Sequence, residues 1–314
     1  MSKVRVGFLG TPDFAVSCLR GLLEDEHFDV VGVVTQPDRP SGRKMLMTPS
    51  PVKSLAEAKG LRVISPESVN RELILQEVQK WGAEIAIVVA FGQIVSQKFL
   101  DSFRLGCVNV HASLLPRWRG AAPIQRAVAA GDEISGVVLQ KMVKELDAGD
   151  VLGARQIPIY ENMNAKELHD QLALLGSDLL RVELMDYVRG NLAPLSQDPK
   201  FVTYAKKIEK SEAEIKWSNS AVQIHNQVRA FVMGPGTWVS FQGKKLKIHR
   251  TEIESKAKSS HQAGEIVSLS SDTLSVATGE GLLKILEVQP ESRNRMLVSD
   301  FLKGHSLKKG DRLV

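Results

Sequence analysis

Residues 4–12 read VRVGFLGTP, an apolar run that ends in a glycine, a threonine and a proline. The run is typical of a buried strand, and residues 12–23 have the apolar spacing of a helix. We expect a tight strand-to-helix turn here, with Thr11 as the helix N-cap and Pro12 at the first helical position. A second strand-like run at 30–34 completes a βαβ unit.

The alternation of strands and helices continues to about residue 190. We expect helices at 52–59, 71–81, 123–130 and 165–189, and strands at 61–64, 85–90, 107–111, 136–143 and 156–160. This order predicts an α/β fold with a doubly wound, mostly parallel sheet.

Doubly wound sheets often bind dinucleotides, but the glycine pattern here does not fit the dinucleotide-binding fingerprint. The dinucleotide fingerprint needs a third glycine where this chain has Ala15. It also needs an acidic residue at the end of the second strand, which instead reads Val34-Thr35-Gln36. The sequence therefore argues against a nicotinamide cofactor.

The chain turns polar and proline-bearing after residue 190, as interdomain linkers do. We expect a first domain at 1–189, a linker at 190–208 and a second domain at 209–314. The second domain shows one amphipathic helix at about 221–231 and then five brief strands, at 237–241, 245–253, 264–269, 273–278 and 282–288. That pattern predicts a small β-barrel.

Charge is distributed unevenly along the chain. Residues 1–199 hold 22 Lys and Arg against 24 Asp and Glu, whereas residues 200–314 hold 19 against 12. A basic C-terminal third favours a polyanionic partner such as nucleic acid. A lysine-rich surface that serves only solubility is the alternative.

The cysteine content and the hydropathy indicate the compartment. Two cysteines, Cys18 and Cys107, are too few for a disulfide framework or a Cys-x-x-Cys metal site. The chain has no export signal and no run of roughly 18 apolar residues. We therefore expect a cytoplasmic protein without membrane contact.

A candidate site lies in residues 109–120, which read NVHASLLPRWRG. Asn109 and His111 alternate on a strand, so both side chains point to one face, roughly 6 to 7 Å apart. They come at the carboxyl end of the strand, where open α/β sheets bind ligands. Their N–H groups suit a carbonyl oxygen that becomes an oxyanion. The alternative is that Asn109 and His111 are core residues whose polar groups only satisfy hydrogen bonds inside the protein and bind no ligand.

Asp147 follows the next apolar strand, in a segment that reads LDAGD at 146–150. If the two strands are neighbours, Asp147 can orient His111 and raise its basicity. Cys107 lies on the same strand face, but roughly 13 Å from His111, which argues against a cysteine nucleophile. His111 has no second histidine at ligand spacing, so we expect no metal.

These segments resemble the 10-formyltetrahydrofolate-dependent formyltransferases. The resemblance rests on Asn109-Val-His111, on SLLPRWRGAAPIQ at 113–125 and on LDAGD at 146–150, where Ala148 replaces the usual threonine. It extends to GTPDF at 10–14, to segments within 36–53, to VTYA at 202–205 and to RLV at 312–314. It therefore covers nearly the whole chain.

The resemblance implies a Rossmann-like first domain and an OB-like barrel behind it. It implies transfer of a formyl group from 10-formyltetrahydrofolate to the amino group of initiator methionyl-tRNA, and we expect a monomer. The implied catalytic residues are Asn109, His111 and Asp147. The implied folate contacts are Ser113, Leu114, Leu115 and Pro116.

The connection at 36–50 is long for an α/β unit, which usually needs about 2 to 6 residues. It gathers positive charge at Arg39, Arg43 and Lys44, next to apolar residues at 45–47. The resemblance implies that this loop contacts tRNA, with Arg43 at the position of a family arginine. We expect it to be mobile in the free protein, and the alternative is a surface insertion with incidental charge.

Two other functions fit parts of the sequence. A formyltransferase for a small amine, of the glycinamide ribonucleotide or amino-sugar type, shares the asparagine, histidine and aspartate but has no use for a basic second domain. A catalytically idle RNA-binding protein has no use for Asn109, His111 and Asp147 together.

Overall fold

The computed structural model describes residues 3–41 and 45–313, and its contacts divide the chain into two compact units. Unit 1 comprises Met1–Gly120, Ser135–Ile157 and His169–Ala205. Unit 2 comprises Ala121–Ile134, Pro158–Leu168 and Lys206–Val314. Both units are therefore discontinuous in sequence.

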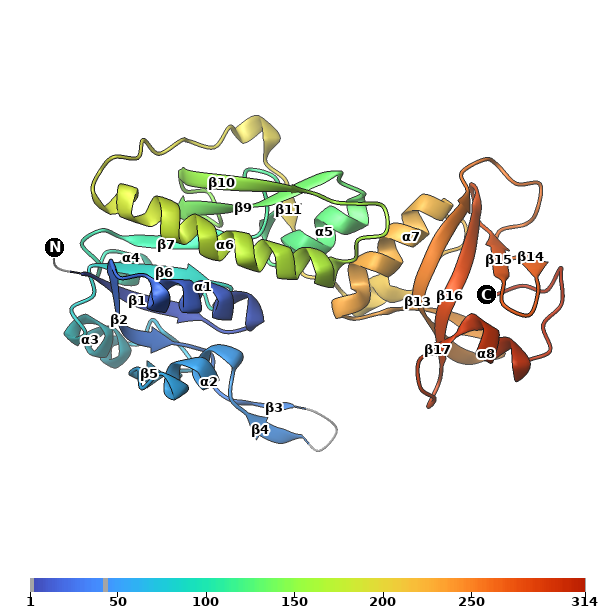
Figure 1. Cartoon of the computed structure of the whole chain (residues 1–314), viewed down its shortest axis with the longest axis horizontal. Coiled ribbons are helices and arrows are strands. Elements are labelled where there is room, and N and C mark those ends of the chain that lie inside the picture. Colours follow the sequence, from blue (N-terminus) through green and yellow to red (C-terminus); the bar gives the residue numbers. More distant parts are fainter. Residues whose placement is uncertain (1–2, 42–44, 314) are drawn as a thin grey trace. The chain divides into compact units, whose positions relative to one another are not determined.

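Unit 1 is built on a seven-stranded sheet in the order β10-β9-β7-β6-β1-β2-β5 (Figure 1). The strands are β1 (Val4–Gly10), β2 (Phe28–Val34), β5 (Val63–Ile64), β6 (Ile85–Val89), β7 (Cys107–His111), β9 (Ile134–Lys141) and β10 (Val151–Pro158). The pairs from β5 through β2, β1 and β6 to β7 are parallel, and β9 runs antiparallel to β7. The predicted mostly parallel sheet is confirmed.

Helices cover both faces of this sheet. The helices are α1 (Asp13–Glu24), α2 (Pro51–Ala58), α3 (Glu72–Lys80), α4 (Gln97–Leu100) and α6 (Ala165–Val188). On one face α6 approaches β7 and β9 closely, since a side chain at Gly176 would meet Val110 and Val137. On the other face Trp81 and Phe99, from the ends of α3 and α4, are fully buried in an apolar cluster. No helix in the described part of the chain is long and apolar enough to span a membrane.

The turn after β1 differs from the prediction. Pro12, not Thr11, is the N-cap of α1, and it makes no side-chain capping bond. The Thr11 hydroxyl instead donates to the carbonyl of Phe91, 3.0 Å away, and accepts the backbone N–H of Gln36 at 3.4 Å. The prediction of Thr11 as a helix cap was therefore wrong. Its hydroxyl instead links residues that follow the carboxyl ends of β1, β2 and β6.

The long connection after β2 contains a hairpin of β3 (Arg39–Ser41) and β4 (Leu46–Thr48), seen below the sheet in Figure 1. Its base is tied to the body of unit 1, because Lys53 pairs with Asp38 at 2.9 Å. Met45, Leu46 and Met47 are each at least 63% exposed. The hairpin therefore presents apolar side chains to solvent.

Unit 2 contains an antiparallel sheet in the order β12-β13-β16-β15-β14, with β17 paired to β16. The strands are β12 (Thr237–Phe241), β13 (Lys244–Ser255), β14 (Ile266–Leu269), β15 (Leu274–Ala277), β16 (Leu282–Pro290) and β17 (Met296–Leu297). Three register shifts interrupt the pairing of β13 with β16, and such bulges bend a sheet. The helices are α5 (Pro123–Ala130), α7 (Ala221–Ala230) and α8 (Val298–Lys303). The five strands predicted from sequence are all present.

Candidate active site

Asn109 and His111 lie on one face at the carboxyl end of β7. Asn109 stands directly opposite Gln140 of β9, and His111 stands opposite Val138. Residues opposite each other in an antiparallel pair share a face, so Gln140 joins the two predicted side chains. Sequence reasoning missed Gln140, because its strand was expected to contribute only apolar residues.

Asp147 reaches this face by an unexpected route. Because β9 is antiparallel to β7, its carboxyl end lies beside the amino end of β7, far from His111. The loop after β9 then turns back, and the amide of Lys141 bonds to the carbonyl of Asp150 at 2.9 Å. Asp147 has a φ of +47°, which a short polar side chain tolerates. The two strands are neighbours, as the prediction required, but the loop after β9 and not the strand end brings Asp147 to His111.

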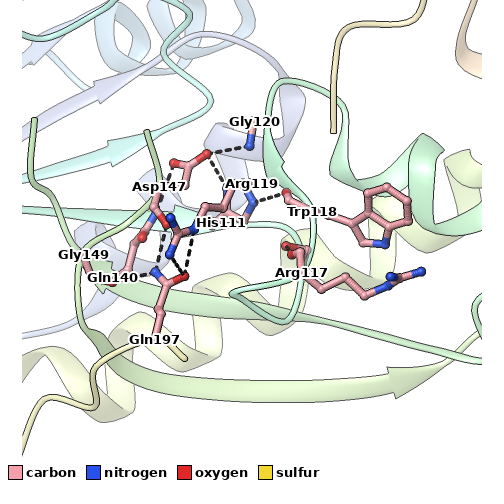
Figure 2. A network of polar contacts seen from close by, with 10 residues as sticks. His111, Arg117, Trp118, Arg119, Gly120, Gln140, Asp147, Gly149 and Gln197 are labelled. Carbon is pink, nitrogen blue, oxygen red and sulfur yellow. Dashed lines mark hydrogen bonds and ion pairs between the residues drawn. The ribbon is translucent and has the colours of Figure 1, made fainter. Parts of the chain in front are cut away.

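The Asp147 carboxylate is held at both oxygens (Figure 2). Its Oδ2 accepts the amide N–H of Gly120 at 2.8 Å, and its Oδ1 accepts the Nε2–H of Gln140 at 3.1 Å. Oδ2 also lies 3.7 Å from His111 Nδ1. That separation suits an ion pair but is too long for a hydrogen bond. The Asp147 carboxylate is therefore held beside the imidazole without a hydrogen bond to it.

The other ring nitrogen of His111 is engaged as well. Its Nε2–H donates to the Trp118 carbonyl oxygen at 2.9 Å, and His111 is only 6% exposed. The carbonyl thus occupies an oxygen position within the 2.7 to 3.1 Å that an oxyanion donor requires. Within residues 3–41 and 45–313, the Asn109 side chain makes no hydrogen bond, so its amide is available to a substrate.

Residues 195–205 form hydrogen bonds with the two loops that carry Asp147 and Trp118. The Gln197 amide donates to the carbonyls of Asp147 and Gly149 at 2.8 and 2.7 Å, and Arg119 donates twice to Gln197 Oε1 (Figure 2). The Thr203 hydroxyl accepts the amide of Trp118 at 2.9 Å. Next to it, β11 (Tyr204–Ala205) pairs with β8 (Arg119–Gly120). The segment predicted as a linker therefore fixes the Asp147 loop and the Trp118 loop.

The predicted folate contacts form the first part of the Trp118 loop. The Ser113 hydroxyl is buried and donates to the Arg117 carbonyl at 2.7 Å, so it stabilises the loop. Leu114 packs against Gly136, and the carbonyl of Pro116 accepts the amide of Thr203 at 3.3 Å. Leu115 is partly exposed, as are its two neighbours. The loop lies directly beside His111, and its role in folate binding stays a prediction.

The cysteine and metal alternatives concern Cys107 and the possible metal ligands. Cys107 lies at the opposite end of β7 from His111, and burial raises the pKa of its thiol to about 12. No group of three or more His, Cys, Asp or Glu suited to a metal ion occurs within residues 3–41 and 45–313.

Of the predicted tRNA contacts, only Arg39 can be placed. It is exposed on β3 and pairs with Thr48 across the hairpin. Arg43 and Lys44 lie outside the described residues, and so does the tip of the loop that was expected to be mobile.

Known proteins match this chain over nearly its whole length. Residues 3–182 match the family described as formyl transferase, and residues 207–306 match the formyl transferase C-terminal domain. The chain belongs to the formyl transferase family. Of the family's curated members, the methionyl-tRNA formyltransferase of Bdellovibrio bacteriovorus is 64% identical over 316 residues, covering 100% of this chain and 99% of that protein.

Further relatives agree with this assignment. The methionyl-tRNA formyltransferase of Neisseria meningitidis is 43% identical over 312 residues, covering 99% of this chain and 100% of that protein. A solved N-formyltransferase of Helicobacter canadensis, in complex with folinic acid and dTDP-3-aminofucose, shares the fold. It has a TM-score of 0.67 at 17% identity and covers 91% of this chain and 99% of that one.

Gly149→Ala is expected to disturb this formyltransferase site. A Cβ at Gly149 would lie 1.7 Å from the carbonyl oxygen of Lys141, so the loop that carries Asp147 must shift. We expect a loss of about 1 to 3 kcal/mol in the free energy of unfolding and a fall in kcat of about 10²-fold. Denaturant unfolding and steady-state kinetics measure the two effects.

Gly304→Ala is the matched control. Its added Cβ would meet nothing nearer than 3.9 Å, and the φ of Gly304 is −102°. Equal stability and equal turnover for the two variants would show that Gly149 has no special role in placing the loop.

Proposed function

We propose that this formyltransferase transfers the formyl group of 10-formyltetrahydrofolate to the α-amino group of methionyl initiator tRNA. The product is N-formylmethionyl-tRNA, which is used in translation initiation. The observation that carries the chemistry is the convergence of Asn109, His111 and Asp147 at the carboxyl edge of the sheet. The choice of tRNA is supported by the names of full-length relatives that are 64% and 43% identical.

The reaction requires two things of the site. The neutral amine attacks the formyl carbon, a new C–N bond forms, and the formyl oxygen becomes negative. The bond to N10 of the folate then breaks, N10 takes up a proton, and the amine loses one. The site must therefore stabilise an oxyanion and remove a proton.

His111 and Asn109 are placed for the first task. The Nε2–H of His111 already points at an oxygen atom 2.9 Å away, and the Asn109 amide lies on the same face. With folate bound, the formyl oxygen would accept hydrogen bonds from the His111 imidazole and the Asn109 amide. A preorganised donor of this kind contributes about 3 to 4 kcal/mol.

The pair of His111 and Asp147 is placed for the second task. The carboxylate, 3.7 Å from Nδ1, stabilises positive charge on the imidazole, so the pair can take the proton that the amine loses. Acid–base assistance of this kind accelerates a reaction by about 10²- to 10⁴-fold. These steps use only side chains of unit 1.

The C-terminal third supplies the surface for tRNA in this proposal. Lys245 and Lys247 are exposed on β13, and the Lys245 ammonium lies 4.2 Å from the centre of the Trp238 ring. Basic and aromatic side chains together suit a nucleic acid backbone and its bases. We also propose a catalytic domain at 1–189, a linker at 190–208, a tRNA-binding domain at 209–314 and a cytoplasmic monomer.

A comparison of formyl acceptors tests the proposal. The protein is given labelled 10-formyltetrahydrofolate and, in separate reactions, methionyl initiator tRNA, glycinamide ribonucleotide or a dTDP-linked amino sugar. We expect kcat/KM for the charged tRNA to exceed that for either small amine by at least about 10³-fold. Faster transfer to a small amine would assign the enzyme to that substrate class instead.

A further inference from the structure

Gln140 lies in the middle of the site although no catalytic step uses it. It is 1% exposed on β9 and stands opposite Asn109, so its side chain belongs to the same face as the catalytic pair. Its Nε2–H bonds to Asp147 Oδ1 at 3.1 Å (Figure 2). Gln140 therefore touches the carboxylate from the side away from His111.

This bond determines how the carboxylate is turned. Oδ2 has two neighbours, the amide of Gly120 at 2.8 Å and His111 Nδ1 at 3.7 Å. A single donor at Oδ2 leaves the carboxylate free to rotate about the Cβ–Cγ bond. A second donor at Oδ1 removes that freedom, so the two donors together keep Oδ2 facing the imidazole.

Packing does not explain a glutamine at this position. Its Oε1 is buried and has no hydrogen-bond partner in the described part of the chain. A buried polar atom without a partner destabilises the fold, and an apolar side chain of the same length would avoid that cost. The amide is therefore explained by the hydrogen bond that it donates.

We propose that Gln140 is a positioning residue for formyl transfer, which holds the Asp147 carboxylate in the orientation that serves His111. This inference rests on the proposed function. Because Gln140 acts through Asp147 and does not reach the reacting atoms, its loss lowers kcat and leaves both KM values nearly unchanged.

Gln140→Met is the test variant, because methionine has nearly the same length and volume without the amide. We expect kcat to fall about 10- to 100-fold, with the KM for folate and for tRNA within about threefold of wild type. Ser135→Ala is the matched control, since Ser135 is also buried on β9 but lies on the other face. Its kcat stays within about twofold of wild type.

A double-mutant cycle separates positioning from a general structural effect. In the Asp147→Asn enzyme, Gln140→Met is expected to cause no further fall in kcat, because the group that it positions is already lost. A structural defect would lower kcat by the same factor in both backgrounds. An equal factor, or an unchanged kcat in the single Gln140→Met variant, would overturn the proposal.

Gln140→Glu keeps the test valid if the methionine variant unfolds. It preserves the shape but, once ionised, has no donor and places a second carboxylate at Asp147, so at a pH above the loss of the shared proton kcat again falls at least about 10-fold. Turnover equal to wild type would overturn the proposal. If the wild-type enzyme transfers no formyl group in the same assay, the proposed function fails, which is a different result from a failure of Gln140 alone.

Discussion

The His111→Ala enzyme is expected to form product at least about 10²-fold more slowly than wild type, and Asn109→Ala and Asp147→Ala are expected to match it. The reason is that the three side chains act on the same charged intermediate. In the proposed mechanism His111 donates to the oxyanion through Nε2, which in the structure donates to the Trp118 carbonyl oxygen, and it faces the Asp147 carboxylate through Nδ1, 3.7 Å away. Steady-state kinetics with saturating folate and tRNA measure kcat, and a thermal melt checks the fold.

His169→Ala is the control for this series. His169 is also a buried histidine of unit 1 with an aspartate beside it, since its Nδ1 lies 2.9 Å from Asp170. It packs against Phe14, away from the site, so its loss affects stability more than turnover. The double variant His111→Ala with Asp147→Ala is expected to be hardly slower than either single one. Fully multiplied effects, or normal turnover in any of the three, would contradict the shared site.

The second large effect is the salt dependence of tRNA binding. A protein that neutralises several phosphates releases counterions, so we expect tRNA affinity to fall by at least about 10²-fold between 50 and 200 mM salt. Folate binding is expected to change little, because the proposed folate contacts at 113–116 lie in unit 1 and not in the basic C-terminal third. Fluorescence titration at four salt concentrations gives both dependences.

Removing three lysines from β13 tests which surface is responsible. The triple variant Lys244→Gln, Lys245→Gln and Lys247→Gln is expected to bind tRNA about 10-fold or more weakly and to show a shallower salt slope. The control removes the same charge from unit 1, at the exposed Lys3, Lys59 and Lys80. Equal weakening by both triple variants would mean that net charge, and no particular surface, binds tRNA.

The sequence predicted the helices and strands of this fold well, because the periodic spacing of apolar residues depends on which face of each element is buried. Strand β12 was placed at 237–241, where the structure has it, and α6 and α7 within a residue at their ends. The prediction failed at Thr11, because a partner 80 positions away, Phe91, competes for its hydroxyl. Local patterns do not report such distant partners.

For the site residues, too, local patterns predicted some features, whereas features that depend on distant parts of the chain were missed. Asn109 and His111 were placed on one face by strand alternation, and Asp147 was expected near them if its strand was a neighbour, which it is, although the loop that carries Asp147 there was not foreseen. The direction of β9 depends on the route of the whole chain, which no local pattern contains. Gln140 was missed because its strand was expected to contribute only apolar residues, and Gln197 because its partners lie in loops whose course is determined only by tertiary packing.

A single-turnover reaction tests the central claim most directly. Enzyme in excess is mixed with labelled 10-formyltetrahydrofolate and methionyl initiator tRNA, and the amino acid is released from the tRNA and identified. The account predicts formylmethionine from the charged tRNA, and no labelled product from uncharged tRNA or from methionyl-tRNA whose amino group is acetylated. Absence of formylmethionine with the folded wild-type enzyme, or label on the uncharged tRNA, would contradict it.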